Sequence, residues 1–282
     1  MKRRVVLNIS FCITIAFALH HIQYNLLAMP SDGDVRSQIV AHRGASADAP
    51  ENTLASIREA IAQGADACEF DVYGTADGFV VLIHDKEVER TTGAPGVVFE
   101  MRLSELKQLD AGGWKSPDFA GEPVPMLEEA LMLLSGTECR PVIEIKMPGI
   151  SRLVVEAVRK ADMVDRCAVI AFDHDVVREV RGMEPGLRCA WLTDGKSMPS
   201  EDDAALNAAY LDERLDACGA DTIDMHYEQL TQELVEQLHE IGVAVWIYTA
   251  NDEETIQRLS DWGVDAITTD HPAMGLRVVQ PE

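Results

Sequence analysis

Two apolar segments of the chain carry charged residues at alternate positions, a spacing that can build a metal site. Glu69 and Asp71 lie in one segment, and Glu144 and Lys146 lie in the other. Side chains alternate along a strand, so the charged residues of each segment share one face and their apolar neighbours share the other. If the apolar faces pack against helices, the three carboxylates point inward, where they are costly without a cation. Carboxylates offer only oxygen ligands, which suits one divalent cation, Mg²⁺ or Ca²⁺, rather than zinc.

The same patterns also have structural interpretations. Glu69 and Asp71 could lie hydrated at a rim, and Glu144 could simply neutralise Lys146 in a salt bridge. In the functional interpretation, Glu144 binds the cation and Lys146 binds an anionic oxygen of the substrate.

Two histidines stand at the ends of apolar segments, where they could transfer protons. These are His42 and His84. Imidazole changes charge near neutral pH, so two of them flanking a metal would supply the general base and general acid of a phosphoryl displacement. Arg43 can hold a phosphate through two parallel hydrogen bonds. Taken singly, a histidine in this position also suits a structural role, for example His84 bonded to Asp85.

Short β-branched runs alternate with amphipathic segments from residue 38 onward, which indicates a parallel sheet that could position these residues. The expected strands are 39–42, 67–73, 79–84, 141–146, 167–172, 188–192, 220–225, 243–249 and 264–268, and the expected helices are 53–63, 127–135, 152–161, 176–183, 231–241 and 253–262. We therefore predict an α/β fold of the (β/α)8 TIM-barrel type over residues 38–276, a class whose typical length is about 250 residues.

The predicted barrel has one strand too many, so we expect it to be distorted. Residues 67–73 and 79–84 are joined by a link too short for the crossover helix that parallel neighbours need, which favours a hairpin or a wrong assignment. Residues 85–125 are rich in Gly, Pro and charge, and are expected to form a small insertion lobe after the third strand. The charged motifs all end strands, and active sites of this fold form at the C-terminal ends of strands.

An ordered set of short motifs resembles the glycerophosphodiester phosphodiesterase family over nearly all of residues 39–272. The motifs are His42-Arg43-Gly44, Glu51-Asn52-Thr53, Glu69-x-Asp71, His84-Asp85, Arg90-Thr91-Thr92, Leu109-Asp110-Ala111-Gly112, Pro125-x-Leu127-Glu128-Glu129, Glu144-x-Lys146 and Thr269-Asp270-x-Pro272. The resemblance implies a barrel with a small insertion after the second histidine. It also implies a role in lipid metabolism, the hydrolysis of glycerophosphodiesters to sn-glycerol 3-phosphate and an alcohol.

The resemblance further implies a role for each site residue. His42 and His84 would be the acid/base pair, Glu69, Asp71 and Glu144 would bind the divalent metal, Arg43 and Lys146 would hold the phosphate, and Glu51 would help to order the site.

Two departures from the family pattern affect the substrate pocket. Tyr248 stands where the family usually has the tryptophan that forms a wall for glycerol, and Trp246, two residues earlier on the same strand face, is expected to take over that wall. The fifth strand ends in Ala171-Phe172, where the family often has Ser-Phe. We expect Phe172, Trp246 and Tyr248 to contact the substrate, although Phe172 and Trp246 would also suit ordinary core packing.

The acidic composition limits the possible partners. The chain has 48 acidic and 24 basic residues, a formal net charge of −24, which repels nucleic acid, so the expected partner is a small molecule. An anionic substrate then needs a metal or fixed cations. One alternative is a lysophospholipase D type activity on lysophospholipids, which exposed apolar residues at Val97, Val98 and Phe99 would favour. Another is a non-catalytic barrel that binds a phosphorylated ligand. The oligomeric state is not predicted.

Residues 1–30 are expected to lie outside the barrel. Basic residues 2–4 precede the apolar run 5–19, the outline of a secretory signal, which would make the protein exported or periplasmic. Alternatively Met29 is the true start and the protein is cytoplasmic. The run is too short and polar for a stable membrane span. One of the six cysteines, Cys12, lies in this segment, and the other five lack metal spacing, so we expect free, mostly buried thiols.

Overall fold

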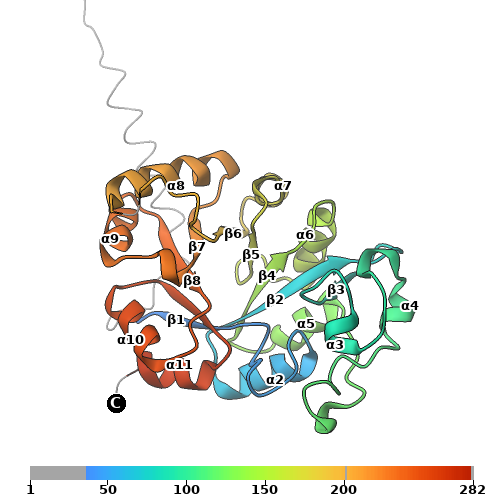
Figure 1. Ribbon diagram of the computed structural model, residues 1–282. Coiled ribbons are helices and arrows are strands. Elements are labelled where there is room, and N and C mark those ends of the chain that lie inside the picture. Colours follow the sequence, from blue (N-terminus) through green and yellow to red (C-terminus); the bar gives the residue numbers. More distant parts are fainter. Residues whose placement is uncertain (1–35, 201, 281–282) are drawn as a thin grey trace, which may run out of the picture. The chain divides into compact units, whose positions relative to one another are not determined.

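The computed structural model describes residues 36–200 and 202–280, which form a closed barrel of parallel strands surrounded by helices (Figure 1). The barrel strands are β1 (Gln38–Ala41), β2 (Ala67–Gly74), β4 (Arg140–Ile145), β5 (Ala168–Ala171), β6 (Arg188–Thr193), β7 (Thr222–His226), β8 (Ala244–Tyr248) and β9 (Ala266–Thr269). Strand β1 closes the ring because it pairs in parallel with both β2 and β9. The predicted barrel is confirmed, while the predicted leader at 1–30 lies outside the described residues.

Helices cover the outside of the barrel. They are α2 (Leu54–Gln63), α5 (Leu127–Leu134), α6 (Ser151–Lys160), α7 (His174–Met183), α8 (Ala204–Cys218), α9 (Gln232–Glu240), α10 (Glu253–Asp261) and α11 (Pro272–Val279). Five of them begin at a polar residue whose side chain accepts a hydrogen bond from the first turn, namely Thr53, Asp173, Asp203, Thr231 and Asp252. Such caps satisfy backbone N–H groups that the helix itself leaves free. Helices α8 and α11 were not among the predicted elements.

The apolar residues form two separate layers around the strands. A large cluster lies between the outward faces of the strands and the helices, and it includes Phe70, Ile143, Ile223 and Met225. A smaller cluster contains buried strand residues only and fills the interior of the barrel. Because the strand faces alternate, Glu69, Asp71 and Glu144 belong to the inward face, as the alternation of charged and apolar residues predicted.

The extra strand is explained by a hairpin. Strand β3 (Val80–Leu82) pairs antiparallel with the C-terminal end of β2, with Val72 opposite Leu82. Strand β2 therefore extends beyond its parallel pairing with β4, which ends at Val72, and the chain then turns back along it. The suspected distortion between the second and third predicted strands is thus a hairpin that carries the chain back toward the barrel.

Residues 85–125 fold into short helices beside this hairpin (Figure 1). They are α3 (Glu89–Thr92), η2 (Val98–Glu100), α4 (Leu103–Leu106) and η3 (Pro117–Phe119). The segment has its own apolar cluster, which contains Val98 at 0% exposure. Of the three candidates for exposed apolar residues, Val97, Val98 and Phe99, only Phe99 is exposed, because Val98 packs inward and Val97 is half-buried.

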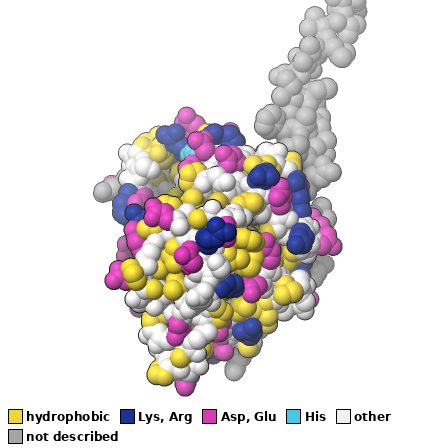
Figure 2. Space-filling model, turned by 90° about the vertical axis from the view of Figure 1, so that its right-hand side faces the viewer, with side chains coloured by type: hydrophobic (Ala, Val, Ile, Leu, Met, Phe, Trp, Pro, Cys, Tyr) yellow, Lys and Arg dark blue, Asp and Glu magenta, His cyan; other side chains and the backbone are white. Residues whose placement is uncertain are grey.

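The side of the molecule that carries this segment has a mixed surface. Figure 2 shows apolar side chains there interspersed with acidic and basic ones. Among the described residues, no helix has the length and apolar character to cross a membrane. The five cysteines of the described part are free and buried, as predicted.

Candidate active site

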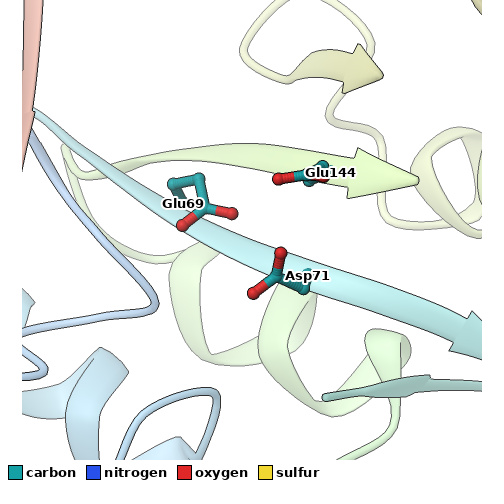
Figure 3. Close-up of side chains that lie close together, drawn as sticks. All are labelled: Glu69, Asp71 and Glu144. Atoms are coloured by element: carbon teal, nitrogen blue, oxygen red, sulfur yellow. The ribbon is translucent and has the colours of Figure 1, made fainter. Parts of the chain in front are cut away.

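Three carboxylates converge inside the barrel on two neighbouring strands. Glu69 and Asp71 lie on β2 and Glu144 lies on β4, where Asp71 is directly opposite Glu144 in the parallel register. Figure 3 shows the three side chains turned toward the same space between the strands. One oxygen of each carboxylate lies within 4.8 Å of one oxygen of both others. The spacing of these residues in the sequence therefore produces a compact all-oxygen cluster.

The cluster is buried and short of positive charge. Oε2 of Glu69 accepts a hydrogen bond from the backbone N–H of Arg43 at 2.8 Å, but its Oε1 has no hydrogen-bond partner among the described residues. Burial, with Asp71 and Glu144 nearby, raises the pKa of Glu69 well above its usual value. Burial and the neighbouring Asp71 also raise the pKa of Glu144, to about 7. Buried carboxylates that repel one another, with an oxygen left unpaired, fit a site for a divalent cation.

Two side-chain cations border the cluster. Nζ of Lys146 lies 2.6 Å from Oε1 of Glu144 and 3.3 Å from Oδ1 of Asp71, and Nε of Arg43 lies 3.3 Å from Oδ2 of Asp71. The salt bridge between Glu144 and Lys146 is therefore present, but it leaves Glu69 without a cation. Burial alone would raise the pKa of Asp71, yet Lys146 and Arg43 together lower it.

The loop after β1 holds Asp71 and Arg43 in place through an unusual backbone. Asn52 donates a hydrogen bond to Oδ2 of Asp71 at 2.8 Å and accepts one from its backbone N–H at 3.0 Å. Arg43 and Asn52 have φ angles of 54° and 55°, a left-handed conformation that few residues other than glycine adopt. At Gly44, with φ of 83°, a Cβ atom would lie 2.3 Å from Oγ of Ser56, so a side chain would not fit.

His42 is held by a carboxylate from the far end of the chain. Its Nδ1 lies 2.6 Å from Oδ1 of Asp270, whose carboxyl also accepts hydrogen bonds from Ser46 at 2.9 Å and Asn251 at 2.6 Å. Burial opposes ionisation of Asp270, but His42 outweighs it and lowers the pKa of this carboxyl to about 2. An ionised Asp270 accepts from Nδ1–H, which leaves Nε2 of His42 to act on a ligand. Sequence reasoning placed Asp270 in a motif but assigned it no role.

His84 is held in the same way by its neighbour. Its Nδ1 lies 2.7 Å from Oδ1 of Asp85, and the Asp85 carboxyl accepts a hydrogen bond from Arg90. Burial lowers the pKa of His84, although Asp71 raises it. His84 follows the antiparallel strand β3 rather than a parallel barrel strand, in agreement with the hairpin that the short link between residues 67–73 and 79–84 favoured. The hairpin compensates for this difference, since its return brings His84 close enough to Asp71 for their charges to interact.

Glu51 links the two arginines of the site. Its carboxylate accepts a hydrogen bond from Arg43 at 2.9 Å and two from Arg90, at 2.7 and 2.8 Å. The two parallel hydrogen bonds from Arg90 to Glu51 fix the plane of the Arg90 guanidinium, which also donates a hydrogen bond to Asp85. Glu51 therefore connects Arg43, which borders the acidic cluster, with Arg90, a residue that sequence reasoning left without a role.

Aromatic side chains stand across the barrel from the β1–β2 side. Phe172 is half exposed and meets Tyr248 edge to face, with ring centroids 6.2 Å apart. His226 also lies edge to face with Tyr248, with ring centroids 5.6 Å apart, and sequence reasoning did not select it. Trp246 differs from the expectation, because it is 8% exposed within the interior cluster and has Arg188 5.9 Å over its ring. Phe172 and Tyr248, rather than Trp246, reach the accessible mouth.

The chain matches the model of the family described as "Glycerophosphoryl diester phosphodiesterase family" over residues 42–274. It is 33% identical over 251 residues to a glycerophosphodiester phosphodiesterase of Caldanaerobacter subterraneus subsp. tengcongensis, a match that covers 87% of this chain and 99% of that protein. It is 32% identical to a glycerophosphodiester phosphodiesterase of Bacillus subtilis, with 83% of each chain covered.

Solved structures resemble the fold as well. A phosphodiesterase of Oleispira antarctica in complex with the product sn-glycerol-3-phosphate has a TM-score of 0.77 at 28% identity, covering 86% of this chain and 97% of that one. A glycerophosphodiester phosphodiesterase of Agrobacterium tumefaciens has a TM-score of 0.71 at 30% identity, covering 85% of this chain and 98% of that one.

Proposed function

Because this chain belongs to the glycerophosphoryl diester phosphodiesterase family, we propose that it performs the family's hydrolysis with one divalent cation held by Glu69, Asp71 and Glu144. The chain is a phosphoric diester hydrolase, which converts glycerophosphodiesters to sn-glycerol 3-phosphate and an alcohol. The observation that carries the metal assignment is the unpaired Oε1 of the buried Glu69 beside two further carboxylates. An all-oxygen set of this kind favours Mg²⁺ or Ca²⁺.

The protein must bring an anionic phosphodiester next to its own acidic residues. A divalent cation held by these carboxylates would supply positive charge that offsets them and polarises a phosphoryl group. Arg43 and Lys146 hold phosphoryl oxygens by charge-assisted hydrogen bonds. Glu51 keeps Arg43 in the orientation that this contact needs, through their 2.9 Å hydrogen bond.

His42 and His84 are the proposed acid and base. One imidazole removes the proton of the attacking hydroxyl group as its oxygen bonds to phosphorus. The other donates a proton to the oxygen of the departing alcohol as its bond to phosphorus breaks. In both residues Nδ1 is bonded to a carboxylate, Asp270 or Asp85, which leaves Nε2 as the atom for the transfer. The attacking hydroxyl belongs either to water or to the substrate itself.

The glycerol end of the substrate is proposed to lie against Phe172 and Tyr248. Their edge-to-face pair forms an apolar wall. The Tyr248 hydroxyl donates a hydrogen bond to the backbone carbonyl oxygen of Thr193 at 3.0 Å. Tyr248 therefore offers its ring to the substrate rather than its hydroxyl. Trp246 supports this wall from inside the barrel.

Metal dependence is tested with the Glu69→Gln variant. After EDTA treatment the wild-type protein should release no sn-glycerol 3-phosphate from glycerophosphocholine, and Mg²⁺ or Ca²⁺ should restore the release. The variant keeps an oxygen for the Arg43 N–H but loses the charge, so activity should fall about 100-fold or more. In thermal unfolding, the added cation should raise the melting temperature of the wild type but not of the variant.

The control is Glu236→Gln, a change at an exposed glutamate of α9, which should behave as the wild type. Undiminished turnover after exhaustive EDTA treatment, or an unchanged metal-dependent melting shift in Glu69→Gln, would contradict the metal site.

A further inference from the structure

A fourth acidic residue, Asp224, points into the barrel without any role in the mechanism above. It lies in the middle of β7, and its neighbours Ile223 and Met225 pack outward against the helices. In the parallel register Asp224 is opposite Leu192 of β6 and Trp246 of β8, which both belong to the interior cluster. Since strand side chains alternate, the Asp224 carboxyl also faces the interior.

This carboxyl is buried and unpaired. Asp224 is 2% exposed, and its Oδ1 has no hydrogen-bond partner among the described residues. Burial, with Glu144 nearby, raises the pKa of Asp224 to about 8. A neutral carboxylic acid carries one O–H donor and keeps acceptor capacity. Buried polar atoms are almost always paired, so an orphaned one needs an explanation, and a ligand group is one.

Asp224 is placed beside the proposed substrate wall rather than in the metal cluster. Among the described residues, the acidic cluster consists of Glu69, Asp71 and Glu144 and does not include Asp224. Tyr248 of β8 is opposite His226 of β7, two residues beyond Asp224 on the same strand face. Asp224 therefore lies outside the acidic cluster, on the strand next to the one that carries Tyr248.

We propose, on the basis of the function proposed above, that Asp224 binds a free hydroxyl group of the glycerol moiety. A hydroxyl both donates and accepts a hydrogen bond, so it can pair with the unpaired Oδ1 of Asp224 whether the carboxyl is ionised or neutral. The phosphate is a poor match, because the proposed function already assigns it to Arg43, Lys146 and the cation. A choline group is a poor match as well, since it has no hydrogen-bond donor for Oδ1. Glycerol remains as the part of the substrate whose chemistry fits an unpaired carboxyl beside an apolar wall.

The test compares two product-like ligands that differ only in hydroxyl groups. Calorimetric titration of the full chain with saturating Mg²⁺ measures the Kd of sn-glycerol 3-phosphate and of n-propyl phosphate, which has the same phosphate but no hydroxyl. The wild type should prefer sn-glycerol 3-phosphate by about tenfold to a hundredfold, the range expected when a buried polar group is left unpaired.

The variants should separate hydroxyl recognition from a structural role. Asp224→Leu should weaken the binding of sn-glycerol 3-phosphate to the level of n-propyl phosphate, whose own Kd should change less than about twofold. Asp224→Asn keeps a donor and an acceptor and should retain most of the preference. If Asp224→Leu fails to fold, Asp224→Ala takes its place. Melting temperatures verify that each variant is folded.

Equal weakening of both ligands, or no change in either, would overturn the assignment of Asp224. Neither result would affect the proposed function, which is tested separately by the release of sn-glycerol 3-phosphate from glycerophosphocholine by the wild type. Failure of that release would overturn the proposed function itself.

Discussion

At the residue scale, both site histidines are oriented through Nδ1 by a carboxylate. For His42 that carboxylate is Asp270, and for His84 it is Asp85. Each carboxylate is held in turn, Asp270 by Ser46 and Asn251, and Asp85 by Arg90. These bonds select the imidazole tautomer in which Nε2 carries no proton.

Removal of these groups predicts graded losses of activity. His42→Ala and His84→Ala should each lower kcat by about 10²- to 10⁴-fold on glycerophosphocholine, because the proton transfer is lost. Asp270→Asn should lower kcat by about 100-fold or more with little change in KM, since the amide no longer selects the tautomer. Ser46→Ala removes one bond to the same carboxyl and should have a smaller effect. The metal-dependent rise in melting temperature should persist in all four variants.

Full turnover by either alanine variant would contradict the acid/base assignment. A KM effect without a kcat effect in Asp270→Asn would instead indicate that Asp270 acts on substrate binding.

At the element scale, the β2–β3 hairpin allows one side of the barrel to supply most of the site. Strand β2 carries Glu69 and Asp71, and the antiparallel return through β3 brings His84 beside Asp71. A regular crossover helix would have placed the next residues at the opposite end of the barrel. The departure from regular strand–helix alternation is thus the feature that gives the site its second histidine.

A second element-scale contact lies far from the site and predicts a dependence of stability on pH. His239, in the last turn of α9, lies 3.0 Å from Asp265, whose hydrogen bond raises the pKa of His239. A raised pKa in the folded state means that the contribution to stability is complete below the unfolded value, about 6.5, and disappears as pH rises through the folded value. Both side chains are more than a third exposed, which limits the contribution to about 0.5 kcal/mol.

The measurement is urea unfolding of the wild type and of His239→Gln at pH 5.5 and pH 8.5. The wild type should be more stable than the variant at pH 5.5 and equal to it at pH 8.5. The comparison at a single pH cancels the contributions of all other titrating groups. A difference that is the same at both pH values would show that packing, rather than the ion pair, distinguishes the two proteins.

At the scale of the whole molecule, charge governs how substrates approach. The formal net charge of −24 repels an anion at long range, whereas Arg43, Lys146 and a bound metal attract it only within the site. Salt screens the long-range repulsion by the net charge before it screens attraction within the site, because the Debye length falls from about 30 Å at 0.01 M to about 8 Å at 0.15 M. The net charge of the substrate should therefore decide how its hydrolysis responds to ionic strength.

This predicts different salt responses for two substrates of the same class. The kcat/KM of glycerophosphoglycerol, a net anion, should rise about two- to fivefold between 0.01 M and 0.15 M NaCl at saturating metal. The kcat/KM of zwitterionic glycerophosphocholine should stay constant, and it serves as the control for salt effects on the protein. A decrease for the anionic substrate alone would mean that the positive charge of the site dominates at long range.

The sequence by itself determined the fold class and the composition of the acidic cluster. Both follow from short-range periodicity, since alternation within β2 and β4 decides which side chains face inward, and strand–helix alternation predicts a parallel sheet. The ordered motifs also selected His42, His84, Arg43 and Lys146 as candidate site residues. These signals are local, so they can be read without knowing how the sheet closes.

Only the tertiary structure decided the contacts between distant segments. Asp270 meets His42 across 228 residues because β9 and β1 are neighbours in the closed ring. The direction of β3 and the burial of Val98 depend likewise on how the hairpin and residues 85–125 pack. Asp224 was overlooked because its pairing with Leu192 and Trp246, and the absence of a partner for its Oδ1 among the described residues, arise from strand register and packing. No short-range pattern encodes those relationships.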